Sequence, residues 1–116
     1  MSNENINNET ITVIIKHPGQ EPRIVENFAN NLKSYQEVVG GYIEVAELPN
    51  HSDIDIVMNE EGKLRELESN IVCREYNDIF VGTIIVVGVD EEVGDWCSLT
   101  KDQITAAIDY LNRNSI

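Results

Sequence analysis

The stretch that decides the fold is IFVGTIIVVGV, residues 79–89. It is apolar and rich in β-branched side chains, and Gly82 and Gly88 interrupt it. A continuous apolar run of this kind is typical of a strand buried on both faces, because both sets of alternating side chains must avoid water. We therefore predict that residues 79–89 form the central strand of a sheet.

Shorter runs with strand character lie before and after this segment. Pro18-Gly19 separates the first two runs, which predicts a hairpin, and Pro49-Asn50 ends the third. In the third run we expect Ile43 and Val45 on one face and the glutamates on the other. The predicted strands cover residues 10–15, 23–28, 42–48, 54–58 and 96–98.

The segment between residues 59 and 78 has mixed signals. Residues 59–62 fit a type I turn that ends in a left-handed Gly62, which predicts that residues 63–65 return antiparallel to the strand before them. Residues 66–78 mix apolar and polar side chains without a regular period. We expect these residues to be irregular.

Two segments carry helix signals. Within residues 30–39 apolar side chains recur at helical spacing, and Gly40-Gly41 supplies the left-handed conformation that ends a helix. Thr100 and Gln103 form a capping box before an apolar stripe in residues 104–111, so we expect the C-terminal helix to pack on the sheet. The sequence thus predicts an α+β fold with a mostly antiparallel sheet of about six or seven strands and two helices.

Length and composition are those of one globular domain. The chain has 116 residues with 41% hydrophobic and 25% charged side chains, and we assign residues 10–116 to a single domain after a polar tail at residues 1–9. The start shows no leader pattern and no apolar run reaches the length of a membrane span, so we expect a cytoplasmic protein. Cys73 and Cys97 are not spaced as a redox pair and are expected to be buried thiols.

Charge and motifs limit the functions open to the chain. The net charge of −13 disfavours direct binding to nucleic acid and to anionic membranes. No motif for a nucleophile, a phosphate loop or a zinc protease is present, and His17 and His51 each flank a predicted turn. We therefore expect no catalytic residues, no cofactor and no metal. An enzyme that uses paired carboxylates with Tyr42 or His51 is the less favoured alternative.

A small cluster of cations suggests one type of binding site. Lys63, Arg65 and Arg74 are close in a chain with only 8 basic residues, and together they could hold a phosphate or a carboxylate. The alternative is that they form solvated ion pairs with neighbouring glutamates. The predicted ligand-binding set is Gly40, Gly41, Asn59, Lys63, Arg65 and Arg74.

The acidic residues suggest a second type of site. An acidic face could dock on a basic protein, and its association would weaken with salt. The candidate contacts are Glu44, Glu47, Asp53, Asp55, Glu60 and Glu61. A homo-oligomer formed through an exposed sheet edge is compatible with either site.

Three motifs resemble a family of small uncharacterised proteins found in phages, plasmids and Firmicute genomes. They are VGGYIE at residues 39–44, NEEGKL at residues 59–64 and SLTxxQ at residues 98–103, and the resemblance extends over residues 10–112. It implies a mobile-element setting, in which short non-enzymatic proteins that block host defences are common.

With this setting in mind, we rank three functions that the chain could have. The first is a counter-defence binding protein that sequesters a small anionic, nucleotide-derived signal. The alternative is an acidic inhibitor that mimics DNA and docks on a basic host protein such as a nuclease or a DNA-binding factor. A structural or assembly role is the third.

Overall fold

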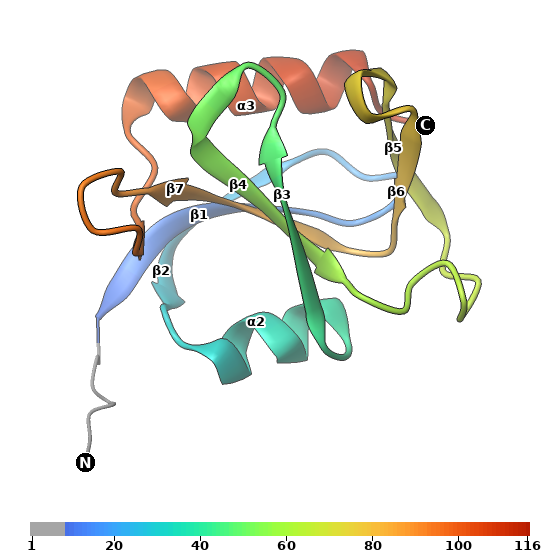
Figure 1. Cartoon of the computed structure of the whole chain (residues 1–116), viewed down its shortest axis with the longest axis horizontal. Helices are drawn as coiled ribbons and strands as arrows, with labels where there is room; N and C mark the ends of the chain where they lie inside the picture. Colours follow the sequence, from blue (N-terminus) through green and yellow to red (C-terminus); the bar gives the residue numbers. More distant parts are fainter. Residues whose placement is uncertain (1–8) are drawn as a thin grey trace.

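The computed structural model describes residues 9–116 and has three layers. Figure 1 shows a twisted sheet between two helices, with α3 (Lys101–Arg113) on one face and α2 (Leu32–Val39) on the other. Most of the predicted tail, residues 1–8, lies outside the described residues. Within residues 9–116, no helix combines the length and the apolar character needed to cross a bilayer.

The main sheet is antiparallel throughout and is built around β7 (Ile84–Val89). Its strand order is β2-β1-β7-β4-β3, and the short β8 pairs with the far end of β7. Residues 84–88 of β7 are buried, as expected for a strand at the centre. The α+β prediction is therefore confirmed. The other strands of this sheet are β1 (Thr10–Lys16), β2 (Arg23–Ala29), β3 (Ile43–Leu48), β4 (His51–Asn59) and β8 (Trp96–Cys97).

Both faces of the sheet bury apolar side chains, which explains the unbroken apolar run in β7. Alternate residues of a strand point to opposite faces, so consecutive isoleucines and valines serve two separate cores. The core beneath α3 includes Ile14, Ile56, Val86, Ala107 and Leu111. The core above α2 includes Ile15, Val57, Ile85, Tyr35 and Val39.

Both predicted helices are present and begin and end where their capping residues indicate. The Asn31 side chain accepts a hydrogen bond from the Ser34 N–H at the start of α2, and Gly40 has a φ of 85° at its end. Thr100 and Gln103 form both bonds of the predicted capping box at the start of α3. Helix α3 packs on the sheet, as the sequence predicted.

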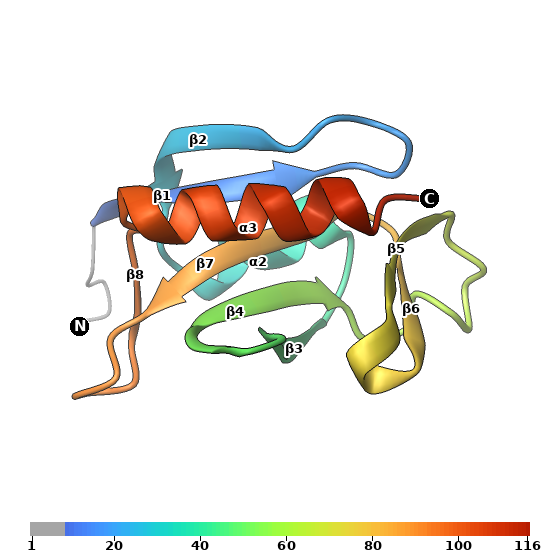
Figure 2. The same ribbon diagram turned by 90° about the horizontal axis from the view of Figure 1, so that it is seen from above.

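The prediction of one long central strand was wrong at its first half. Gly82, with a φ of 75°, separates β7 from β6 (Asp78–Val81), and β6 pairs with β5 (Ser69–Cys73) in a separate two-stranded sheet. Residues 66–78 are therefore not all irregular, because they contain β5 and the single-turn helix η1 (Arg74–Tyr76). Figure 2 shows this hairpin beside the main sheet.

The predicted return strand at residues 63–65 was also wrong. These residues lie in turns, with the Arg65 N–H bonded to the Glu61 carbonyl at 2.9 Å. Strand β4 already pairs with β3 on one edge and β7 on the other, so no further strand can join it. Gly62 is not left-handed; it is buried, and a Cβ there would lie 2.7 Å from Val81 Cγ2.

A buried polar contact fastens the β5–β6 hairpin to the main sheet. Lys16, at the end of β1, is 1% exposed, and its ammonium donates to Asn70 Oδ1 at 2.7 Å. The Asn70 amide nitrogen in turn donates to the carbonyls of Lys16 and Gly82 at 2.9 and 2.8 Å. Asn70 is fully buried, so these bonds replace those that water would supply.

Candidate functional site

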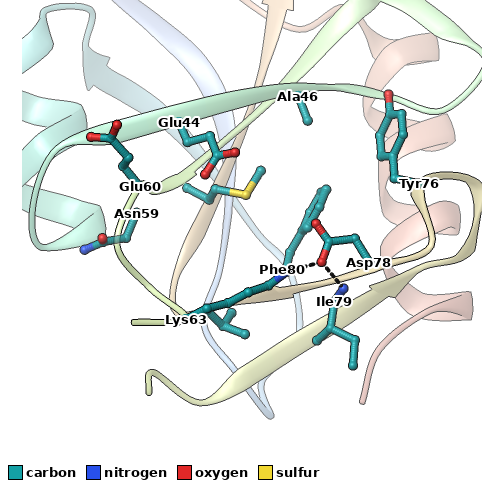
Figure 3. Close-up of a pocket in the computed structure, with 11 residues that line it drawn as sticks. Glu44, Ala46, Asn59, Glu60, Lys63, Tyr76, Asp78, Ile79 and Phe80 are labelled. Carbon is teal, nitrogen blue, oxygen red and sulfur yellow. Dashed lines mark hydrogen bonds and ion pairs between the residues drawn. The ribbon is translucent and has the colours of Figure 1, made fainter. Parts of the chain in front are cut away.

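A pocket of about 470 Å³ lies where the β3–β4 hairpin meets the β5–β6 hairpin. Figure 3 shows side chains from β3, β6, η1 and the turn after β4 around this hollow. Strand β3 contributes Glu44 and Ala46, which are two residues apart and therefore point to the same side. The pocket exists because two segments far apart in the sequence are brought together.

The floor and one wall of the pocket are apolar. Met58 and Phe80 are nearly buried and line the floor. The Tyr76 ring stacks on Phe80 with centroids 6.4 Å apart, and its hydroxyl donates to the Glu47 carbonyl at 2.7 Å. Tyr76 is therefore held in place as a wall, although its ring is partly exposed to solvent.

The rim of the pocket is negatively charged. Glu44, Glu60 and Asp78 line it together with one cation, Lys63, which is paired with Asp78. The hydrogen bond from Lys63 is the largest cause that lowers the pKa of Asp78, and the Ile79 N–H adds a second bond at 2.8 Å. The rim thus carries three carboxylates against one ammonium. An apolar floor with such a rim suits a ligand that has both aliphatic and cationic parts.

Comparison with protein-family models gave one match that covers this pocket. The model is described as a domain of unknown function, DUF3846, and it matches residues 11–113. The chain belongs to the DUF3846 family. No curated protein and no solved structure gave a match. The family prediction is confirmed at this level, and the pocket lies within the matched region.

Part of the predicted ligand-binding set of this DUF3846 chain does come together, at the C-terminal end of α2. The Asn59 amide donates to the Val39 carbonyl at 3.0 Å, and Arg65 Nη1 donates to the Gly40 carbonyl at 2.8 Å. A Cβ at Gly41 would lie 3.0 Å from the Asn59 amide nitrogen. These donors satisfy carbonyls that a helix end leaves unpaired.

The other two predicted cations lie elsewhere. Lys63 and Arg74 line a shallow groove of about 480 Å³ on the β5–β6 hairpin, together with Asn77. Lys63 is engaged with Asp78, and Arg74 donates to Asn114 Oδ1 at 3.3 Å. Arg65 is not among the residues that line this groove. The DUF3846 fold therefore brings two of the three cations to one surface.

The predicted acidic contacts divide between different surfaces. Glu44 and Glu60 line the pocket, and Glu61 is exposed in the following turn. Glu47 is opposite Asp55 in the β3–β4 register, and it lies three residues from Glu44 and so on the other face. The prediction that the glutamates of this strand share a face was wrong.

Two of these acidic residues have structural partners. Asp55 Oδ2 accepts a hydrogen bond from the Trp96 indole at 2.8 Å, and Asp53 Oδ2 accepts one from the Gln103 side chain at 3.0 Å. Gln103 is also the glutamine of the capping box of α3. Asp53 and Asp55 therefore join strand β4 to β8 and to the start of α3.

Sequence reasoning missed Tyr76 and Asp78, which are central to the pocket. Both fall in the segment that was expected to be irregular. A signal was present, because Asn77-Asp78 separates two short β-branched runs and Asn77 adopts a φ of 53°. That pattern would have predicted a hairpin with Tyr76 and Asp78 near its turn.

The remaining candidate groups of the DUF3846 chain have ordinary surroundings. His17 Nδ1 lies 2.8 Å from Thr83 Oγ1. Both cysteines are free thiols, but the prediction that both are buried was wrong for Cys97, which is half-buried in the short edge strand β8, whereas Cys73 is buried. Among residues 9–116, no group of three or more His, Cys, Asp or Glu side chains is placed to hold a metal ion.

Proposed function

We propose that this DUF3846 chain is a non-enzymatic binding protein that holds a basic segment of a partner protein in the pocket between β3 and β6. The observation that carries the proposal is the apolar floor of Met58 and Phe80 under a rim of three carboxylates. The aliphatic part of a lysine or arginine would cover the floor while its charged end meets the rim. The net charge of −13 would steer such a partner toward the protein.

Lys63 supports this proposal, because its ammonium already takes the place beside Asp78 that a cation of the partner would take. Its ammonium pairs with Asp78, and both side chains are partly exposed. A partner cation could displace it, since a solvent-exposed ion pair contributes little stability. The site is thus already shaped to hold a cationic group beside Asp78.

Neutralising the rim tests this function. We expect the triple change Glu44→Gln, Glu60→Gln and Asp78→Asn to weaken binding of an oligolysine peptide at low salt by about tenfold, because it removes three charge contacts of a fraction of a kcal/mol each. Isothermal titration calorimetry measures the loss.

A matched control removes the same charge elsewhere. The changes Glu26→Gln, Glu37→Gln and Glu92→Gln alter exposed carboxylates outside the pocket. They should weaken binding much less than the rim variant, since distant charges are screened by salt. Equal losses in both triple variants would show that the peptide responds to net charge alone.

The resemblance to phage and plasmid proteins extends the proposal to counter-defence. On this view the partner is a basic host protein in the cytoplasm, such as a nuclease or a DNA-binding factor. The acidic rim and the high negative charge favour it, because proteins that hold DNA present basic surfaces. Capture of such a partner should weaken steeply with salt.

A second candidate function is sequestration of a small anionic signal. It is favoured by the groove that Lys63 and Arg74 share with Asn77. It is the weaker candidate, because Arg74 is already bonded to Asn114 Oδ1 and a net charge of −13 repels an anionic ligand.

Thermal shift separates the two functions. The second function predicts that ATP or cyclic AMP raises the melting temperature, by the equivalent of about 2.7 kcal/mol at a hundred times its dissociation constant. The variant Lys63→Glu with Arg74→Glu should then lose the shift, whereas Lys33→Glu with Lys101→Glu should keep it. The first function predicts no shift with either nucleotide in the wild-type protein.

A further inference from the structure

Strand β3 is the last strand on its side of the main sheet. Figure 2 shows it at the opposite edge from β2, and its pairing partner within residues 9–116 is β4 alone. An edge strand presents unpaired N–H and C=O groups that can pair with another chain.

The hydrogen bonds between β3 and β4 show which backbone groups of β3 point away from β4. The Glu60 N–H donates to the Tyr42 carbonyl at 2.8 Å, so these two residues form a hydrogen-bonded pair just before the strand. In an antiparallel ladder such pairs alternate with pairs whose backbone groups point outward. Glu44 and Ala46 therefore bond toward β4. The residues whose backbone groups point away from β4 are Ile43, Val45 and Glu47.

One end of this edge is closed and the rest is open. The Glu47 carbonyl accepts the Tyr76 hydroxyl at 2.7 Å. Within residues 9–116, no strand pairs with Ile43 or Val45 on the outer side, and Val45 is 44% exposed. The open part of the edge begins beside Tyr42, which is 68% exposed, and ends at Tyr76.

Charge decides which chain this edge would accept. A second copy would place this glutamate-bearing edge against an identical edge, on two molecules that each carry a net charge of −13. Like charges across a strand pair are destabilising. A basic segment would instead meet Glu44 on the pocket side and Glu47 on the other side.

We propose that β3 accepts an extended basic segment of a partner protein as an additional strand of the sheet. This inference rests on the proposed function, because every second side chain of the added strand lies on the pocket side with Glu44. One lysine or arginine of that strand reaches Asp78 and replaces Lys63 there. The backbone bonds supply affinity, and the pocket supplies specificity for the cation.

A proline at residue 45 tests the pairing without altering the pocket. The Val45 N–H points away from β4, so Val45→Pro removes an outward donor and no ladder bond, and edge strands tolerate proline. We expect this variant to bind a short capped peptide of alternating lysine and valine at least about tenfold more weakly at low salt. Val45→Thr is the control, because it keeps the N–H and a β-branched side chain and should bind as the wild type does.

Amide hydrogen exchange of the wild-type protein gives an independent readout. On peptide binding, exchange at Ile43 and Val45 should slow, whereas Glu44 and Ala46, already bonded to β4, should change little. Contact by side chains alone would not produce this alternation. If the proline variant fails to fold, the exchange pattern decides the question.

Each outcome separates the inference from the proposed function. If Val45→Pro binds normally and the alternation is absent, while the rim variant still weakens binding, strand addition is wrong and the proposed function stands. If neither the proline nor the rim variant affects binding, both are wrong. Failure of the peptide to bind the wild-type protein at low salt overturns the inference directly.

Discussion

Replacing Asn70 with alanine is expected to lower the free energy of unfolding by about 3 kcal/mol. The change leaves the ammonium of Lys16, a residue that is 1% exposed, without its hydrogen-bond acceptor. It also removes the donor to the carbonyls of Lys16 and Gly82. Among residues 9–116, the Lys16 ammonium has no carboxylate within ion-pair distance to compensate. Urea unfolding followed by circular dichroism measures the loss.

The control is Asn112→Ala, at an exposed position on α3. This substitution should leave stability nearly unchanged, because alanine is a better helix former than asparagine and no contact is lost. A loss at Asn70 as small as that at Asn112 would mean that Lys16 finds another partner or reaches water.

The pH dependence of the same variant provides a second measurement. Burial lowers the pKa of Lys16 below its usual 10.5, while Glu21 acts in the opposite direction. The unfolded chain therefore holds this proton more tightly, and stability rises as pH rises from the lowered pKa toward 10.5. Without Asn70 the charged form loses support and the pKa should fall further. The stability difference between variant and wild type should thus shrink at alkaline pH, and a constant difference would contradict this account.

Gly82→Ala is expected to lower the free energy of unfolding by about 2 kcal/mol or more. Gly82 has a φ of 75°, which alanine adopts only with strain, and an added Cβ would lie 2.8 Å from Leu67 Cδ1. The residue also separates β6 from β7, so a shift there would move the β5–β6 hairpin against the main sheet. Chemical unfolding measures the loss, and peptide binding should weaken with it.

Gly94→Ala is the matched control for this substitution. Gly94 has a φ of 82°, but nothing lies within 4 Å of an added Cβ. Gly94→Ala should therefore lower the free energy of unfolding only through the strain of its backbone conformation, by about 1 kcal/mol. Adding Leu67→Ala to Gly82→Ala should recover part of the difference between the two glycines. Equal losses at Gly82 and Gly94 would show that the contact with Leu67 has no energetic consequence.

The parts of the fold that the sequence predicted depend on short-range signals. The caps of α2 and α3 involve residues three positions apart, Asn31 with Ser34 and Thr100 with Gln103, so the chain displays them locally. The position of the β5–β6 hairpin against the main sheet could not be predicted, because a contact across 54 residues, between Lys16 and Asn70, helps to hold it there. No pattern among neighbouring residues predicts such a contact.

The candidate site could be predicted only in part, because its residues are also brought together by contacts between distant parts of the sequence. Asn59 and Lys63 were selected and do line the pocket, and so were Glu44 and Glu60. The sequence assigned the cations and the acids to separate sites, because it could not show that the turn after β4 carries Lys63 to Asp78 on β6. Tyr76 and Phe80 become a wall and a floor only when the two hairpins meet.

The central position of β7 has a consequence for synthesis on the ribosome. Strands β1 and β4 emerge long before β7, yet they pair with β7 and not with each other. The nascent chain therefore carries two hairpins whose apolar faces have no common neighbour until residues 84–89 leave the exit tunnel. During that interval the edges of β1 and β4 that later pair with β7 have unpaired backbone groups.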